Sequence, residues 1–313
     1  MHNLPLTFTP LYQERVWGGR ELENVYNRTL PAADVPFGES WEITDRSNEQ
    51  SVVSTGDLAG KSLHQLWSNQ REEIFGAGFT SERFPLLIKI LDARDDLSIQ
   101  VHPPVELAAD LGGEPKTEMW YIADVAPDAK IYVGLKNGTT KESFEKALTD
   151  GTCEEQVHAI APKSGESIHI PSGRIHAIGA GLLIYEIQQN SDTTYRVYDW
   201  NRVGLDGVPR ELHVAESMKC IDFNDFEPKM DTPKGNTIAL CEYYHVQQID
   251  LTASETVGNP EADRFSIVTV VSGEVSDSAG NSYVAGDFMI LPVGADALTA
   301  KNSARVLLTT VPR

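Results

Sequence analysis

A row of polar side chains at two-residue spacing is the first feature of this sequence that could do chemistry. Residues 97–104 alternate apolar and polar residues, which predicts a β-strand that carries Ser98, Gln100 and His102 on one face. An imidazole and an amide oxygen on one face are potential ligands for a divalent cation. The strand therefore predicts part of a metal site.

A second histidine follows a turn signature. The signature begins at Gly165, continues with Pro171 after five residues and with Gly173 after one more, and ends at His176 after two further residues. Proline and glycine at these positions predict a tight turn between two strands, which places the imidazole at the start of the second strand. Glu118, in the strand predicted after the polar row, is a candidate carboxylate ligand.

Gln100, His102, Glu118 and His176 could converge on one cation. Two neutral imidazoles, a carboxylate and an amide oxygen suit zinc with water completing the shell, and manganese, cobalt or iron would also fit. Taken singly, a strand histidine is more often a core or surface residue, and Glu118 could simply pair with Lys116, which shares its face. The metal site is therefore a hypothesis that rests on the four residues together and on none of them alone.

Two further charges lie in apolar runs. Lys89 interrupts the nearly continuous apolar strand predicted over 84–93, and Glu186 interrupts the apolar run 182–188. A charge in such a strand needs a partner or a function, because burying it alone is costly. Glu186 could pair with Lys89 or Lys116 or have a function of its own, and both can hold together.

Composition excludes several classes of partner. The chain has 313 residues, 41% of them hydrophobic, and a formal net charge of −20, so we expect no binding to nucleic acid or to an anionic membrane. Its three cysteines form no CxxC pair, which is typical of reduced thiols. The first residues resemble no secretion signal and no run is long enough to span a membrane, so we expect a cytoplasmic protein.

An internal repeat divides the chain. Gly286, Pro292 and Gly294 repeat the spacing of the first turn, but Ala297 stands where His176 would be. Ser266 stands at the position that corresponds to Glu118. The second copy thus keeps the turn without the ligands, and we predict a metal-binding domain over 1–222 and a degenerate copy without ligands over 223–313.

The remaining elements follow from periodicity. We interpret 16–19 as a turn and 38–43 as a strand, in which Glu39 and Glu42 are most simply solvated. Apolar residues at helical spacing predict helices at 60–76, 105–111 and 210–220 and a small helical insertion over 140–160. Short strands are predicted at 237–250, 264–275, 282–292 and 304–311, as in an antiparallel sandwich.

Several longer runs carry a family resemblance over nearly the whole chain. These runs are 16–19 (VWGG), 38–41 (GESW), 89–93 (KILDA), 98–103 (SIQVHP), 171–179 (PSGRIHAIG) and 189–200 (QNSDTTYRVYDW). The turn before His176 resembles the second motif of cupin jelly rolls, and the runs together resemble the type I mannose-6-phosphate isomerases in their short bacterial form. The resemblance implies a mainly β fold with two cupin jelly-roll domains and a few short helices.

The same resemblance implies a site. It implies one zinc ion per chain held by His102, Glu118 and His176, with Gln100 as a further ligand, and a catalytic arginine at Arg196. The segment 140–160 is too short to be the helical domain of the long-form enzymes.

The activity implied is the interconversion of mannose 6-phosphate and fructose 6-phosphate. One proton moves between C1 and C2 through an enediol, which requires a base and stabilisation of oxygen charge. We predict Glu186 as the base, with Arg196 and Lys116 as further catalytic residues; burial would raise the pKa of Glu186 toward working pH.

The phosphate must meet positive charge in an acidic protein. We predict Ser98, Lys89 and Arg202 as substrate-binding residues, with Lys116 as a further available cation, and Trp17 at the mouth of the site. The oligomeric state is left open between monomer and homodimer.

Two other classes of function remain open at this stage. Cupins also host other metal-dependent sugar-phosphate enzymes and iron dioxygenases, although a dioxygenase would need an apolar pocket. A non-catalytic sensor would bind the sugar phosphate without turnover.

Overall fold

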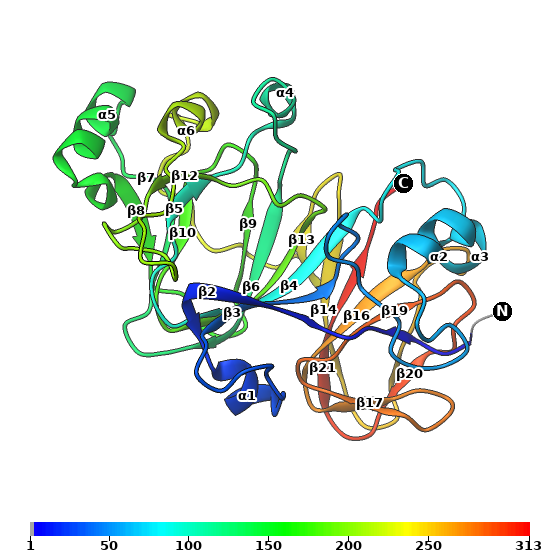
Figure 1. Ribbon diagram of the computed structural model, residues 1–313. Helices are drawn as coiled ribbons and strands as arrows, with labels where there is room; N and C mark the ends of the chain where they lie inside the picture. Colours follow the sequence, from blue (N-terminus) through cyan, green and yellow to red (C-terminus); the bar gives the residue numbers. More distant parts are fainter. Residues whose placement is uncertain (1–2) are drawn as a thin grey trace. The chain divides into compact units, whose positions relative to one another are not determined.

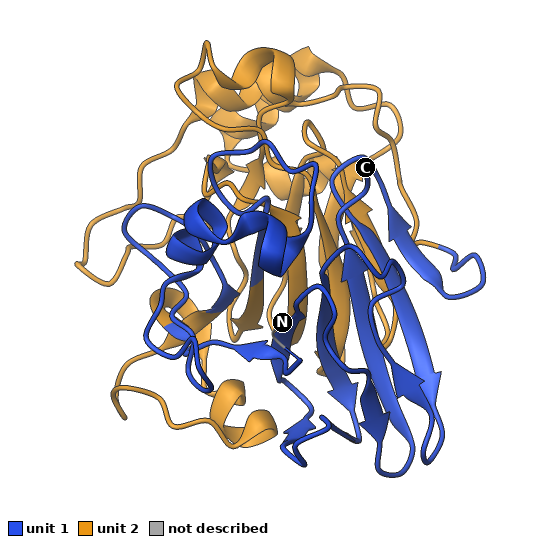
Figure 2. Ribbon diagram, turned by 90° about the vertical axis from the view of Figure 1, so that its right-hand side faces the viewer, with its two compact units in different colours: residues 1–11, 41–88, 232–313 blue, residues 12–40, 89–231 orange. Residues whose placement is uncertain are grey.

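The computed structural model describes residues 3–313 and divides them into two compact units (Figure 2). Unit 1 comprises residues 1–11, 41–88 and 232–313, and unit 2 comprises residues 12–40 and 89–231. Strands β3 (Phe37–Ile43) and β4 (Leu86–Ala93) cross the division. Each unit is described by itself.

Unit 2 is built on two antiparallel sheets (Figure 1). One sheet has the order β2-β3-β4-β11-β6-β9 and the other β12-β5-β10-β7-β8. The remaining strands of these sheets are β2 (Leu11–Gly19), β5 (Ile99–Val101), β6 (Glu118–Val125), β7 (Ile131–Leu135), β8 (Val157–Ile160), β9 (Ser167–Ile170), β10 (His176–Ile178), β11 (Leu182–Gln189) and β12 (Tyr195–Tyr198). The helices are α1 (Glu21–Tyr26), α4 (Val105–Ala108), α5 (Lys141–Asp150), the 3-10 turn η1 (Cys153–Gln156) and α6 (Val214–Cys220), which packs on β12 and β5.

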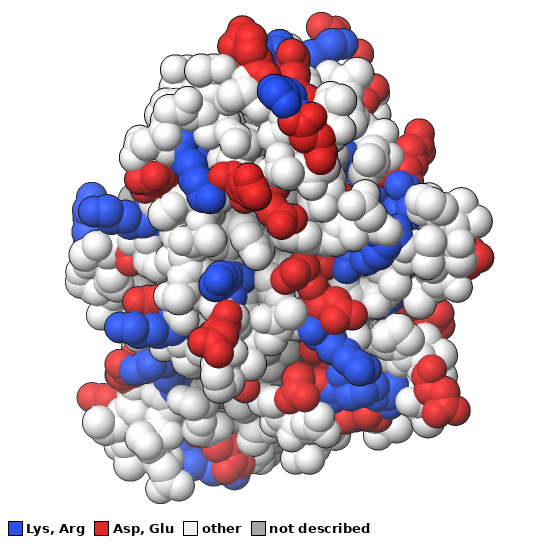
Figure 3. All heavy atoms as spheres, turned by 90° about the vertical axis from the view of Figure 1, so that its left-hand side faces the viewer, with Lys and Arg blue, Asp and Glu red and all other residues white. Residues whose placement is uncertain are grey.

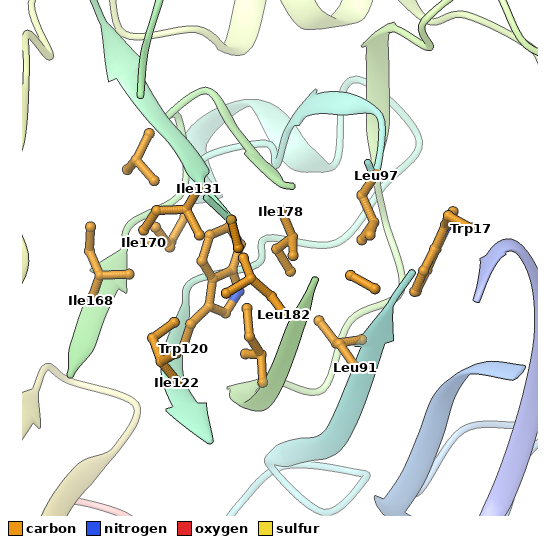
Figure 4. Packing of buried hydrophobic residues seen from close by; sticks show 14 residues of the cluster. Trp17, Leu91, Leu97, Trp120, Ile122, Ile131, Ile168, Ile170, Ile178 and Leu182 are labelled. Carbon is orange, nitrogen blue, oxygen red and sulfur yellow. The ribbon is translucent and has the colours of Figure 1, made fainter. Parts of the chain in front are cut away.

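The core of unit 2 fills the space between these sheets. The Trp120 ring lies among Ile131, Ile170 and Leu182, and Trp17 lies beside Leu91 and Leu97 (Figure 4). These side chains come from alternate positions of strands, so that the neighbouring positions face the other way. Burying each large side chain stabilises the unit by about 1.5–3 kcal/mol.

Unit 1 repeats the two-sheet plan. Its sheets have the orders β1-β19-β16-β21-β14-β13 and β15-β20-β17-β18. The elements are β1 (Leu6–Thr7), α2 (Leu63–Asn69), α3 (Arg71–Phe75), β13 (Thr237–Leu240), β14 (His245–Leu251), β15 (Thr256–Val257), β16 (Ser266–Ser272), β17 (Glu274–Ser276), β18 (Ser282–Val284), β19 (Phe288–Leu291), β20 (Leu298–Ala300) and β21 (Ala304–Thr310). The prediction of a mainly β chain with few short helices is confirmed.

The register shows that the sequence repeat is structural. In unit 2, Glu118 of β6 pairs with Ile170, the residue before the Pro171 turn. In unit 1, Ser266 of β16 pairs with Leu291, the residue before the corresponding turn. The position that carries the carboxylate in the first copy is thus occupied by a serine in the second, and the Ser266 hydroxyl donates to Asn259 at 2.7 Å.

The turn predicted over 16–19 is wrong, because these residues are the end of β2. Gly18 and Gly38 instead allow two strands to approach closely: a Cβ on Gly18 would lie 2.3 Å from the backbone nitrogen of Gly38. A glycine in a strand interior often marks such an approach.

Three predicted helices have different bounds in the structure. Over 140–160, the helix ends at Asp150, its C-cap Gly151 takes the left-handed conformation, and β8 follows after η1. Over 210–220, the helix begins only at Val214. The segment 60–76 holds two short helices that end before Gly76, as predicted.

The interpretation of Glu39 and Glu42 as solvated is also wrong. Both lie in β3 and are buried, with 9% and 5% of their surface exposed.

The predicted domains over 1–222 and 223–313 stay a prediction, since the compact units group residues 41–88 with the C-terminal strands.

The Pro-x-Gly turns offer a test of the two copies. Gly173 and Gly294 both have positive φ, 89° and 77°, where a Cβ costs about 1–2 kcal/mol. We expect Gly173→Ala and Gly294→Ala each to lower the free energy of unfolding by about 1–2 kcal/mol in urea denaturation. Ser172→Ala, in the same turn, should change it by less than about 0.5 kcal/mol. Equal stability of all three variants would contradict the argument.

Candidate metal centre and active site

Two sheets of unit 2 deliver three ligand-type side chains to one point. His102 follows β5 and His176 begins β10 in one sheet, while Glu118 begins β6 in the other. The Nε2 atoms of His102 and His176 lie 3.4 Å and 3.6 Å from the two carboxylate oxygens of Glu118. Potential ligand atoms of all three residues lie within 4.8 Å of one another.

The two imidazoles are oriented by backbone carbonyls. His102 Nδ1 lies 2.9 Å from the carbonyl oxygen of Thr193, and His176 Nδ1 lies 2.9 Å from that of Arg174. Because a carbonyl can only accept, each Nδ1 carries the proton and each Nε2 presents its lone pair to Glu118. This tautomer is the one that a metal ligand requires.

Burial and charge set the protonation of the three residues. Burial and the Lys116 ammonium lower the pKa of His102 to about 3, and burial also lowers the pKa of His176. Burial alone would raise the pKa of Glu118, but the Lys116 ammonium, 2.8 Å from Oε2, brings it well below its ordinary value. Neutral imidazoles and an ionised carboxylate are the forms that bind a metal.

The donor set fits a divalent cation. His102 Nε2 and Glu118 Oε1 are buried and make no hydrogen bond among the described residues, while Glu118 Oε2 has the Lys116 ammonium at 2.8 Å. Buried polar atoms are normally satisfied, so the cluster can hold a metal ion whose bonds would satisfy them. The family implied by the sequence is metal-dependent, in agreement with this cluster.

Gln100 lies beside the cluster. It pairs with His176 across β5 and β10, and its Nε2 lies 3.3 Å from His176 Nε2. Its Oε1 accepts a hydrogen bond from the Ser98 hydroxyl at 3.3 Å. Rotation of the amide by 180° would turn the oxygen toward the cluster, so the fourth ligand stays a prediction.

A cavity of about 620 Å³ opens beside the cluster. Eight residues predicted for the site line it: Trp17, Lys89, Ser98, Gln100, Lys116, His176, Glu186 and Arg196. His102 and Glu118 are fully buried next to His176. The cavity walls carry both signs of charge, as expected for a polar ligand.

Glu186 lies between two lysines on the cavity wall. Its Oε1 lies 3.6 Å from Lys89 Nζ and 3.8 Å from Lys116 Nζ, and it makes no hydrogen bond among the described residues. Oε2 accepts a hydrogen bond from Trp120 Nε1 at 3.2 Å. Burial and the charge of Glu118 raise the pKa of Glu186, although both lysines oppose the shift. Both interpretations of this residue, charge partner and candidate base, fit its position.

Three arginines line the cavity, and Arg196 is the one that has no carboxylate within ion-pair distance among the described residues. Its Nη1 donates to the carbonyl oxygen of Glu211 at 2.8 Å, and its buried Nε has no hydrogen-bond partner within residues 3–313. Burial lowers its pKa, and the nearby positive charge of Arg210 lowers it further. The guanidinium is thus available to an anionic group in the cavity.

Arg202 does not line the cavity. It donates through Nε and Nη2 to Asp199 Oδ1 at 3.0 Å and 2.9 Å. Asp199 also accepts from Arg210, which does line the cavity and which the sequence did not suggest. Arg210 follows a loop, so no periodicity points to it.

Arg15 and Glu39 are further wall residues that sequence reasoning missed. Arg15 Nε donates to Glu39 at 2.9 Å, and Lys89 lies 3.6 Å from the same carboxylate. A signal for Arg15 exists: it stands two residues before Trp17, and both share a face once 16–19 is read as strand.

Surface charge agrees with a small polar ligand. Acidic and basic side chains are interspersed on the face of the molecule drawn in Figure 3, without a continuous basic area there. Within residues 3–313, no helix has both the length and the apolar character needed to cross a membrane.

Comparison with known proteins places the chain in a family. Residues 6–133 match the model of the type I phosphomannose isomerase catalytic domain. The chain is 36% identical to mannose-6-phosphate isomerase ManA of Bacillus subtilis, over 97% of this chain and 98% of the relative. The chain belongs to the mannose-6-phosphate isomerases.

Other members of the mannose-6-phosphate isomerase family agree with this assignment. A mannose-6-phosphate isomerase of Streptococcus mutans is 33% identical, over 92% of each chain. The crystal structure of the Bacillus subtilis mannose 6-phosphate isomerase superposes with a TM-score of 0.88 at 33% identity, over 98% of this chain and 99% of that one. The predicted cupin fold is confirmed.

Metal binding by this mannose-6-phosphate isomerase should depend on the triad. We expect His102→Ala and His176→Ala to lower the affinity for a divalent cation by more than about 100-fold, since loss of an outer-shell partner alone costs 10–100-fold. His245→Ala is the matched control, because that ring bonds Thr237 at 2.8 Å in unit 1. Equilibrium dialysis with metal analysis measures the affinity, and undiminished binding by His176→Ala would exclude the triad.

Trp120→Phe tests the electrostatics of Glu186. The indole N–H stabilises the ionised carboxylate, so its loss raises the pKa of Glu186 further. A base acts when unprotonated, and the acid limb of the kcat/KM profile should therefore move to higher pH. Trp67→Phe, which loses a hydrogen bond to the Ser81 carbonyl, should leave the limb in place. An unmoved limb in Trp120→Phe would show that the titrating group is another.

Proposed function

We propose that this chain interconverts mannose 6-phosphate and fructose 6-phosphate through an enediol, and that turnover depends on a zinc ion held by His102, Glu118 and His176. The observation that carries the proposal is a metal-competent triad and a separate buried carboxylate, Glu186, linked through the Lys116 ammonium. Membership of the family supports it. When bound, the ion would supply Lewis-acid stabilisation of the negative oxygen charge.

Glu186 is the proposed base. Moving one proton between C1 and C2 requires a single group that accepts it at one carbon and returns it at the next. Oε1 of Glu186 is free of hydrogen bonds among the described residues, while Trp120 holds Oε2. Lys89 and Lys116 keep a buried carboxylate ionised enough to accept the proton, and burial keeps it basic.

Arg196 and Lys116 complete the proposed catalytic set. Arg196, always charged, stabilises anionic oxygen or orients the sugar. Lys116 holds Glu118 in its ionised form and lies within reach of Glu186. Ser98, Lys89 and Trp17 contribute the wall against which the sugar is placed. Arg202 stays a prediction for substrate binding.

A cytoplasmic location and a monomer or homodimer remain part of the proposal. The three cysteines are free thiols in the structure, which fits a reducing compartment.

The test is turnover with and without metal. Protein stripped with a chelator should form no fructose 6-phosphate from mannose 6-phosphate in a coupled assay, and one equivalent of zinc should restore it. Full activity after complete removal of metal, or no activity with any divalent metal, would contradict the proposal.

Catalytic variants separate the two parts of the site. We expect Glu186→Gln and Arg196→Ala each to lower kcat by at least about 100-fold while the bound metal is retained. Exchange of the C2 proton with tritiated water reports the base step directly. Exchange at the unmutated rate in Glu186→Gln would remove that residue from the role of base.

A further inference from the structure

A single buried carboxylate holds two arginines at the edge of the cavity. Asp199 directly follows β12 and is 5% exposed. Its Oδ1 accepts from Nε and Nη2 of Arg202, and its Oδ2 accepts from Nε of Arg210 at 2.8 Å. The one negative charge of Asp199 thus faces the two positive charges of Arg202 and Arg210, and the three side chains together keep a net positive charge.

The two arginines differ in what they face. Arg210 lines the cavity and Arg202 does not. Asp199 engages Nε and Nη2 of Arg210, so that its Nη1 makes no hydrogen bond among the described residues. A guanidinium has five donors in a fixed fork, and the remaining donors of Arg210 are open to a ligand.

The positive charge extends to Arg196. Burial lowers the pKa of Arg196, and the positive charge of Arg210 lowers it further. Arg202 and Arg15 act in the same direction, whereas the negative charge of Asp199 raises it. Arg15 pairs with Glu39 at 2.9 Å, and Lys89 lies 3.6 Å from the same carboxylate. Glu14, Asp192 and Asp206 also line the cavity, but none of them lies within ion-pair distance of Arg196 or Arg210 among the described residues. Arg196 and Arg210 therefore form an incompletely neutralised pair in a protein of net charge −20.

Strand register fixes the pair relative to the triad. Arg196 pairs with Gln100 across β12 and β5, and Gln100 pairs with His176 across β5 and β10. Adjacent strands lie about 4.8 Å apart, so the backbone of Arg196 lies about 10 Å from that of His176. A hexose 6-phosphate also carries its reacting carbons and its phosphate at opposite ends.

We propose that Arg210 is a specificity-determining residue that binds the substrate phosphate beside Arg196, and that Asp199 is its positioning residue. The proposal rests on the proposed function and adds a residue to it. Bidentate contact of a guanidinium with phosphate oxygens is strong and geometrically selective. The residue gives the chain a preference for phosphorylated over neutral sugars.

Asp199 also fixes the loop between the two arginines. Val203 pairs with Pro209, and Gly204 N–H donates to the Val208 carbonyl at 2.8 Å, which makes a hairpin. Gly204 and Leu205 of this hairpin line the cavity. Because Arg202 and Arg210 stand at its two ends, their common carboxylate holds the hairpin and Arg210 in one arrangement.

Binding of mannitol 6-phosphate and of mannitol to the metal-loaded protein tests the assignment. Neither alditol has a carbonyl, so neither is isomerised and the measurement does not need turnover. We expect calorimetry to show tighter binding of the phosphorylated compound, and Arg210→Ala to reduce the ratio of the two affinities by about tenfold to a hundredfold. Mannitol affinity should stay within about twofold.

Two control variants test whether loss of any arginine, or of the other arginine held by Asp199, has the same effect on the ratio of affinities. Arg305→Ala should keep the ratio, because that guanidinium is held by Asp250 in unit 1 and does not line the cavity. Arg202→Ala should lower it by less than Arg210→Ala does. An unchanged ratio in Arg210→Ala, an equal loss in Arg202→Ala, or no preference in the unmutated protein would each overturn the assignment, whether or not the chain is an isomerase.

Kinetics distinguish positioning from folding. Asp199→Asn should raise KM for mannose 6-phosphate severalfold with a much smaller change in kcat, and Asp199→Glu should restore part of the loss. A fall in kcat at unchanged KM, or equal KM values in the Asn and Glu variants, would contradict the positioning role.

Discussion

The site depends on the burial of one ionised carboxylate. Glu118 is wholly inaccessible, and an ion of this kind costs several kcal/mol to desolvate. Lys116 Nζ, 2.8 Å from Oε2, offsets part of the cost, but the two nearby imidazoles are held neutral and Oε1 makes no hydrogen bond among the described residues. A divalent cation bound by the triad would offset the rest of this cost.

Register is what brings the ligands together. Residues on a strand alternate faces, so a slip of one residue in β5, β6 or β10 would send a ligand out of the site. The second copy shows that the fold itself does not require the ligands. It keeps the register between the strand and the turn, yet Ser266 and Asn259 satisfy each other where Glu118 would stand. Metal competence is therefore a property of a few side chains placed on a shared scaffold.

Sequence reasoning identified what lies on strands and missed what depends on pairing. The Gln100–His102 spacing and the turn before His176 suggested the two histidines, because their periodicity is local, whereas the family resemblance was needed to prefer Glu118 as a ligand over a simple partner of Lys116. Arg15 was missed because a glycine pair needed for close strand approach looked like a turn, and Glu39 was missed because its face of the strand was interpreted as solvated. Arg210 could not be predicted from periodicity, since only its ion pair with Asp199, eleven residues away, gives it a direction.

The charged walls of the cavity also distinguish a sugar-phosphate enzyme from a cupin that binds an apolar substrate. A cupin that bound an apolar substrate would not need lysines and arginines on its walls, whereas Lys89, Lys116 and Arg196 all line this one. These cations share the wall with carboxylates in a chain of net charge −20, so attraction for an anion depends on the cations that no carboxylate pairs, and the chain as a whole repels polyanions.

X-ray absorption at the zinc edge, on protein loaded with one equivalent of metal, tests the central claim most directly. The account predicts two nitrogen ligands at about 2.0–2.1 Å together with oxygen ligands at about 2.0–2.2 Å, and loss of one nitrogen in His176→Ala. A spectrum unchanged by that substitution, or a first shell without imidazole, would contradict it.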